Sequence, residues 1–90
     1  MIRQFVETTI FTKRWHQLGL DEEDLLKLQI YLMKIPDAGD IIVGTGGARK
    51  LRFALRDKGK SGGVRVIYVD VIHDKQIHFL LCYSKAEKRI

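Results

Sequence analysis

The chain has 90 residues, of which 46% are hydrophobic and 30% charged, and its formal net charge is +5. This size suits one small domain over residues 1–90, and the hydrophobic content excludes a disordered chain. No apolar run approaches the roughly 20 residues that a bilayer-spanning helix needs, and the N-terminus lacks the apolar segment of a secretory signal. The lone cysteine, Cys82, lies in an apolar run, which predicts a buried free thiol in a cytoplasmic protein.

The N-terminal part predicts a strand followed by a helix. Residues 2–7 form the candidate strand. The helix is expected to begin at Thr8 or Thr9, whose hydroxyl groups can cap it, and to end at Gly19. Apolar side chains recur at helical spacing between these ends, at Phe11, Trp15 and Leu18. We interpret this stripe as core packing rather than as a site.

A second helix is predicted from Asp21 to the residue before Pro36. Asp21 can cap its start, and the acids of residues 22–24 favour the positive end of the helix dipole. We interpret these acids as a solvated helix start and not as a metal site, because their side chains point in different directions. Pro36 disfavours helical geometry at the residue before it. The two helices are expected to form a hairpin laid on a sheet.

A strand with one cationic face is predicted over residues 49–56, after a turn at 36–40 and a glycine-rich bend at 44–47. Its apolar residues alternate with its cations, which is the pattern of a half-buried strand. The predicted apolar face holds Leu51, Phe53 and Leu55, and the other face holds Lys50, Arg52 and Arg56.

Two further strands are predicted after a loop at residues 57–63 that is too long for a two-residue turn. The run from Val64 to Ile72 is almost continuously apolar, which predicts a central strand buried on both faces. A turn at 73–76 then leads to an antiparallel strand over residues 77–83. Ser84 and Glu87 have the spacing of a capping box. We therefore expect a C-terminal helix to begin there and to have been cut off or lost.

Positive charge is concentrated in residues 49–65, which hold seven Lys or Arg residues against one acid, Asp57. A dense patch of this kind predicts contact with a polyanion or an acidic protein. Arginine suits phosphate because it binds bidentately. We predict a basic, strand-built surface for RNA. The alternative that the residues leave open is a sheet edge that lysines protect from aggregation.

Other site chemistries fit the residues less well. Residues 59–61 end like a phosphate-binding P-loop, but the first glycine of that motif is absent and a strand follows. The glycines of 44–47 do not match the dinucleotide fingerprint and suit a tight turn. The three histidines, His16, His73 and His78, have neither metal nor triad spacing. We expect no metal and no cofactor.

Three blocks of the sequence together resemble a known family. They are GTGGARKLRFA, GKSGGVRVIYVD and IHFLLCYSKAEK, and FVETTIFTKRW precedes them. Over essentially the whole chain this pattern is similar to RelE/HigB toxins of bacterial toxin–antitoxin pairs, particularly the HigB-like branch of the RelE superfamily. The resemblance implies an α+β, RelE-like fold with an N-terminal strand and a helical hairpin packed on an antiparallel β-sheet.

Members usually continue into a helix after the position of Lys88, and some carry a functional tyrosine there. This chain stops at Ile90, so we expect that helix to be missing and activity to be weakened. Tyr68 and Tyr83 are expected to be packing residues.

The resemblance also implies an activity and a site. RelE-like toxins are ribosome-dependent mRNA endonucleases, or mRNA interferases, which inhibit translation and arrest growth. In RelE-like toxins one strand carries two cations at alternate positions, which Lys50 and Arg52 match. An arginine follows a glycine, which Arg65 matches, and a cation follows the last strand, which Lys85 matches. Such a site promotes attack of a 2′-hydroxyl on the adjacent phosphate, because crowded cations favour a neutral lysine base and guanidinium groups offset charge on the phosphorane. Four further cations are expected to bind RNA phosphates: Arg49, Arg56, Lys58 and Lys60.

The implied partners are the ribosome, mRNA and a cognate antitoxin, expected to be a helix-turn-helix HigA-like protein. No membrane is involved.

Two other functions stay open at this point. One is a catalytically weak or inactive RelE-like module that binds RNA or its antitoxin, and the other is a plain nucleic-acid-binding domain. Binding that persists without cleavage would separate the inactive module from the enzyme.

Overall fold

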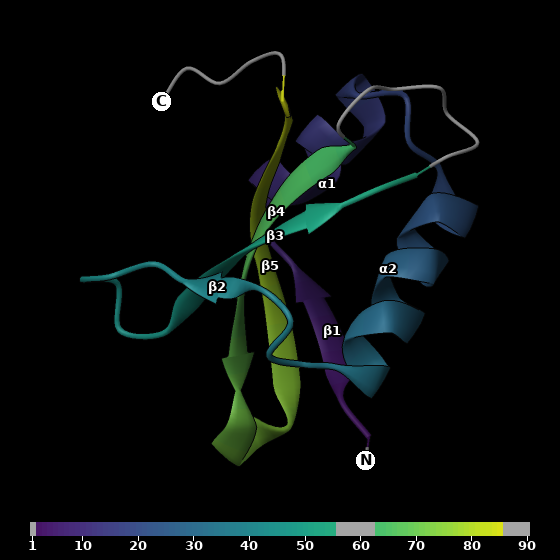
Figure 1. Ribbon diagram of the computed structural model, residues 1–90. Helices are drawn as coiled ribbons and strands as arrows, with labels where there is room; N and C mark the ends of the chain where they lie inside the picture. The colour runs from purple at the N-terminus through teal and green to yellow at the C-terminus, as the bar shows by residue number, and fades with distance from the viewer. Residues whose placement is uncertain (1, 56–62, 86–90) are drawn as a thin grey trace.

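The computed structural model describes residues 2–55 and 63–85, which form a five-stranded sheet with two α-helices (Figure 1). The elements are β1 (Gln4–Glu7), α1 (Thr9–Gln17), α2 (Glu22–Lys34), β2 (Asp40–Ile41), β3 (Ala48–Phe53), β4 (Val64–Val71) and β5 (Gln76–Ser84), with one 3-10 turn at Ile72–Asp74. The strand order is β1-β5-β4-β3-β2, with β1 parallel to β5 and the other neighbours antiparallel. The predicted α+β fold is confirmed, and the first strand joins it as a parallel edge.

Both helices begin where the sequence places a capping residue. The Thr8 hydroxyl accepts a hydrogen bond of 3.0 Å from the Phe11 amide at the start of α1. At the start of α2, the Asp21 and Asp24 carboxylates each accept a hydrogen bond from the other residue's amide, at 2.9 and 3.0 Å. These bonds satisfy amide groups that a helix start leaves without partners. Helix α2 ends at Lys34, two residues before Pro36, as predicted.

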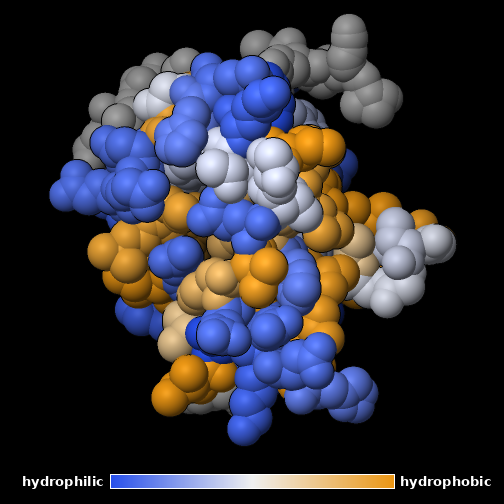
Figure 2. Space-filling model, turned by 180° about the vertical axis from the view of Figure 1, so that it is seen from behind, coloured by the Kyte–Doolittle hydropathy of each residue, from blue (hydrophilic) through white to orange (hydrophobic). Residues whose placement is uncertain are grey.

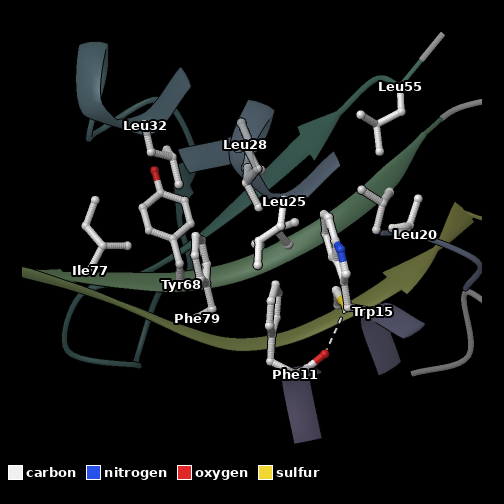
Figure 3. Packing of buried hydrophobic residues seen from close by; sticks show 14 residues of the cluster. Phe11, Trp15, Leu20, Leu25, Leu28, Leu32, Leu55, Tyr68, Ile77 and Phe79 are labelled. Atoms are coloured by element: carbon white, nitrogen blue, oxygen red, sulfur yellow. Dashed lines mark hydrogen bonds between the residues drawn. The ribbon is translucent and has the colours of Figure 1, made fainter. Parts of the chain in front are cut away.

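The helices pack on one face of the sheet and form the hydrophobic core with it (Figure 3). Phe11 of α1 stacks between Trp15 and Phe79, with ring centroids 5.4 and 4.8 Å apart. The Cys82 thiol is buried in this core and donates to the Phe11 carbonyl at 3.8 Å, which confirms the predicted buried cysteine. The core also takes in side chains of α2, β3, β4 and β5: Leu25, Leu28, Leu32, Leu51, Val66, Tyr68 and Ile77.

The second face of β4 is open, which corrects the prediction that this strand is buried on both faces. β4 is central, as predicted, because it lies between β3 and β5. Val64, Val66 and Tyr68 are buried against the helices. The alternate residues are only half-buried: Arg65, Ile67, Val69 and Val71. Both helices cover the same face. The apolar side chains on the other face of β4 therefore pack only against their neighbours within the sheet and stay half-buried.

A buried tyrosine ties the central strand to the segment that follows α2. The Tyr68 hydroxyl donates to the Pro36 carbonyl at 2.8 Å and accepts from the Gly39 amide at 2.9 Å. Burial raises the pKa of Tyr68 above its usual value, and the hydrogen bond from the Gly39 amide opposes this rise only partly. Tyr68 is 0% exposed, which confirms that it is a packing residue.

The glycine-rich bend forms the connection between β2 and β3 and projects from one side of the molecule (Figures 1 and 2). Gly44 and Gly46 have φ angles of 84° and 79°, a left-handed geometry that suits glycine, so the predicted role of these glycines as turn residues is confirmed. Two other predictions fall outside the described residues. They are most of the loop after β3 and the helix start at Glu87, although Ser84 is described and ends β5.

Candidate nucleic-acid interface

Two arginines lie directly opposite each other on the open face of the sheet. The register of β3 and β4 pairs Arg52 with Arg65. Of the residues before and after them, Leu51, Val64 and Val66 are buried on the helix-covered face, and Phe53 is partly buried against the core. Because side chains alternate along a strand, Arg52 and Arg65 point to the opposite, open face. Arg52 is exposed and Arg65 is half-buried.

The two predicted catalytic lysines lie near this pair. Lys50 is two residues before Arg52, on the same face of β3, and is exposed. Lys85 directly follows β5 and is exposed. Its neighbour Ser84 is the register partner of Val64, so Lys85 lies at the end of the sheet where β4 begins. The structure therefore places Lys50, Arg52 and Arg65 on the open face of β3 and β4, and Lys85 just after β5, beside the start of β4.

The arrangement places positive charges on neighbouring strands of one sheet face. Within the part of the chain that the structure describes, Lys50 and Arg52 make no hydrogen bond and no ion pair. Like charges directly opposite each other in a sheet are destabilising. A folded protein retains such a pair at a cost in stability, which is typical of positions that bind a charged ligand. A phosphate group is the ligand that a pair of guanidinium groups suits best.

Glycine at position 63 holds Arg65 in place at the start of β4. Its φ angle of 68° lies in the left-handed region. A Cβ atom there would collide with the Phe53 carbonyl oxygen and would lie 2.9 Å from the Ala54 Cα atom. Only glycine fits where the chain enters β4 so close to the end of β3. Gly63 therefore lets the backbone approach the end of β3 two residues before Arg65.

The structure does not bring Arg49 to the same face. Arg49 is the register partner of the buried Tyr68, and its guanidinium donates to the Gly39 carbonyl at 2.7 Å and more weakly to the Asp37 carbonyl at 3.4 Å. The same alternation that exposes Lys50 and Arg52 turns Arg49 toward the covered face. The other predicted phosphate ligands, Arg56, Lys58 and Lys60, lie outside the described residues.

Tyr83 belongs to this face, although the sequence interpretation assigned it to packing. Its register partner in β4 is Arg65. Cys82 is buried on the helix-covered face, so the next side chain, Tyr83, points to the open face and is half-buried there. The alternation around the buried cysteine could have indicated this orientation. The pairing with Arg65 could not be read from the sequence, because it depends on the register of two strands.

No group of three or more His, Cys, Asp or Glu side chains in residues 2–55 and 63–85 is placed to hold a metal ion. Among the helices that the structure describes, none is long and apolar enough to cross a membrane. The candidate functional site is the group of cations on the open face of β3 and β4.

Comparison with known proteins identifies the fold. No known family model matches the chain. Among solved structures, a mutant of the E. coli toxin RelE in the free state is similar, with a TM-score of 0.68, 19% identity, and 97% of this chain and 86% of that chain covered. The intact E. coli RelBE toxin–antitoxin complex is also similar, with a TM-score of 0.67, 19% identity, and coverage of 96% and 99%. The chain has a RelE-like fold.

Proposed function

We propose that this chain is a ribosome-dependent mRNA endonuclease, the toxin of a toxin–antitoxin pair, from the HigB-like branch of the RelE superfamily. The observation that carries the proposal is the pair Arg52 and Arg65, in register on the open face of a RelE-like sheet, with Lys50 on the same face of β3. The sequence resemblance named these cations, and the fold gathers them at one end of the sheet. Such an enzyme acts in the cytoplasm, where translating ribosomes are found.

The proposed reaction needs only the cations of this site. The amine of Lys50 accepts the proton of a ribose 2′-hydroxyl, and the oxygen attacks the adjacent phosphorus. Arg52 and Arg65 stabilise the negative charge that develops on the phosphorane oxygens. The bond between phosphorus and the 5′-oxygen breaks, and Lys85 supplies the proton that this leaving oxygen takes up. The products are a 2′,3′-cyclic phosphate and a free 5′-hydroxyl.

A translation assay tests the proposal. The purified protein is added to ribosomes translating a defined mRNA, and the cut sites are mapped by primer extension. We expect cuts phased with codons and little cutting of the same mRNA without ribosomes, because the predicted catalytic groups are all cations, which supply charge and do not by themselves select one position on a free RNA. Equal cutting of naked RNA would contradict ribosome dependence. RNA binding without any cleavage would assign the chain to the inactive RelE-like binding module instead.

The proposed partner is a cognate antitoxin of the HigA-like, helix-turn-helix type. An acidic segment that covers the cationic end of the open face would inhibit the enzyme directly. Complex formation would then weaken as salt rises, because exposed charge pairs are screened. Titration by calorimetry at several salt concentrations measures this dependence, and salt-independent binding would place the antitoxin on an apolar surface instead.

A further inference from the structure

Tyr83 differs from every other aromatic residue of the described chain. Phe5, Phe11, Trp15 and Phe79 take part in ring stacks, and Tyr31 and Phe53 form a tilted pair. Tyr68 has two hydrogen bonds at its hydroxyl group. In the part of the chain that the structure describes, Tyr83 alone has neither a ring partner nor a hydrogen-bond partner.

The position of Tyr83 gives this ring a specific neighbourhood. Arg52, Arg65 and Tyr83 are successive register partners across β3, β4 and β5, so they form one row on the open face. Neighbouring strands lie about 4.8 Å apart, so Tyr83 stands one strand away from Arg65 and two strands away from Arg52.

The next row along the strands places two apolar residues beside this aromatic residue. It pairs the half-buried Ile67 with Leu81, which is 38% exposed, and continues on β3 with the exposed Lys50.

We propose that Tyr83 is a stacking platform for one base of single-stranded RNA, with an adjoining phosphate of the same strand on Arg65 and Arg52. Aromatic side chains beside cations are the combination by which proteins hold single strands, since each base has a face that can stack and each nucleotide has a phosphate. A base inside a duplex has no such face to offer. This inference rests on the proposed function, because it names how the substrate of that site is held.

Fluorescence anisotropy tests the proposal without cleavage. The probe is a labelled single-stranded RNA whose 2′-oxygens are methylated, which removes the attacking hydroxyl groups. We expect Tyr83→Leu to raise the Kd about 5- to 100-fold, the effect of losing one base–aromatic stack. Tyr83→Phe keeps the ring, so its Kd is expected to stay within about twofold of the parent.

The matched control is Tyr31→Leu, which removes a tyrosine that is 37% exposed on α2 and packs against Phe53. Because Tyr31 belongs to the helix layer on the other side of the sheet, its Kd is expected to stay within about twofold of the parent.

Salt dependence separates stacking from charge. The slope of log Kd against log salt reports the phosphates that the protein neutralises. Tyr83→Leu is expected to leave this slope unchanged, whereas Arg65→Ala lowers it by about 0.7 for one lost phosphate contact on a single strand. A change of slope in Tyr83→Leu equal to that in Arg65→Ala would overturn the stacking role.

A second variant keeps the test independent of any folding defect. Tyr83→Trp places a fluorescent ring on the platform, and we expect added RNA to quench its emission because the base stacks on it. The parent protein supplies the background, since its Trp15 is 2% exposed and is expected to be unaffected by RNA. Absence of quenching, or parental affinity in Tyr83→Leu, or no binding of the RNA probe by the parent, would overturn the inference.

The outcome for the proposed function can be read separately. Ribosome-dependent cleavage by the parent, with unchanged RNA affinity in Tyr83→Leu, would refute the platform and leave the enzyme standing. No cleavage by the parent, with weakened RNA binding in Tyr83→Leu, would refute the enzyme and support the platform.

Discussion

The two faces of the sheet use arginine in different ways. On the covered side, Arg3 donates to both carboxylate oxygens of Asp70 at 2.8 and 3.0 Å, and this hydrogen bond raises the already high pKa of Arg3. Arg49 donates there to backbone carbonyls. On the open side, Arg52 of β3 lies directly opposite Arg65 of the neighbouring strand β4. Arg52 has no hydrogen bond or ion pair within the described residues.

The tyrosines repeat this difference. Tyr68 on the covered face has a donor and an acceptor at its hydroxyl group, whereas Tyr83 on the open face has neither among the described residues. Polar groups under the helices need partners because water cannot reach them. Groups on the open face can remain available for a ligand. The comparison teaches that this protein keeps polar side chains available for binding on the sheet face that no helix of residues 2–55 and 63–85 covers. Four changes test this conclusion.

The largest effect is expected from Arg65→Ala on the open face. Cleavage on ribosomes should fall about 10²- to 10³-fold, the loss that removal of one preorganised donor to a developing charge produces. The free energy of unfolding should change by less than about 0.5 kcal/mol, because the side chain is not part of the core. Mapped cleavage and thermal melting of the same preparation measure both quantities.

Arg14→Ala is the control for Arg65→Ala, since it removes an arginine of α1 whose side chain donates to Gln17 on the same helix at 2.8 Å. We expect this control to cleave mRNA at the parental rate. A folded Arg65→Ala protein that also cleaves at the parental rate would remove Arg65 from the catalytic site.

Gly63→Ala should have the next largest effect, on stability. The added Cβ atom would collide with the Phe53 carbonyl oxygen, and the backbone there is left-handed. We therefore expect the free energy of unfolding to fall by roughly 2–4 kcal/mol. Gly46→Ala is the matched control, because Gly46 has a similar φ angle of 79° but nothing within 4 Å of the added atom. It should cost roughly 1 kcal/mol. Equal losses in urea unfolding would show that close approach at Gly63 is unimportant.

Tyr68→Phe should destabilise the covered face by about 1–3 kcal/mol, because it leaves the Gly39 amide and the Pro36 carbonyl without their partner. Tyr83→Phe removes the same oxygen from the open face and should change stability by less than about 0.5 kcal/mol. Similar losses in the two variants would contradict the contrast between the faces.

The same tyrosine predicts a dependence on pH. The folded state holds the pKa of Tyr68 above its usual value, so folding favours the protonated phenol. The stability linked to this proton is complete below pH about 10, where the unfolded tyrosine titrates, and is lost as pH rises from there through the folded pKa. The stability difference between the parent and Tyr68→Phe should therefore shrink above pH about 10. A constant difference in unfolding experiments from pH 7 to 11 would contradict this linkage.

The smallest effect is expected from Arg52→Thr, and it has the opposite sign. Removing one of two like charges that face each other should stabilise the fold by about 0.2–1 kcal/mol, and threonine suits a strand. The gain should diminish in 1 M salt, where the Debye length is about 3 Å. RNA affinity and cleavage should fall in the same variant. Arg52→Thr that is less stable than the parent would show that Arg52 supports the fold.

Much of the local structure was predictable because its causes are local. Thr8, Asp21 and Pro36 mark helix ends through groups within a few residues of themselves. Alternation along β3 separated Leu51 from the exposed cations in the same way. The candidate site cations Lys50 and Arg52 followed from this alternation, and their catalytic roles came from the family resemblance.

The misassigned residues share a different cause. The open face of β4 was predicted to be buried because its composition is apolar. Whether a strand face is covered depends on where the helices lie, and both lie on one side here. The prediction for Arg49 treated every cation of the patch alike, although its register partner is the buried Tyr68.

The sequence by itself determined which segments are helices and strands, where the helices end, and which residues carry positive charge, since these depend on neighbours along the chain. The tertiary structure alone decided that β1 lies parallel to β5, that one sheet face stays uncovered, and that Arg52, Arg65 and Tyr83 form one row. The physical reason is that register and layer order arise from contacts between residues far apart in sequence, and no local pattern records those contacts.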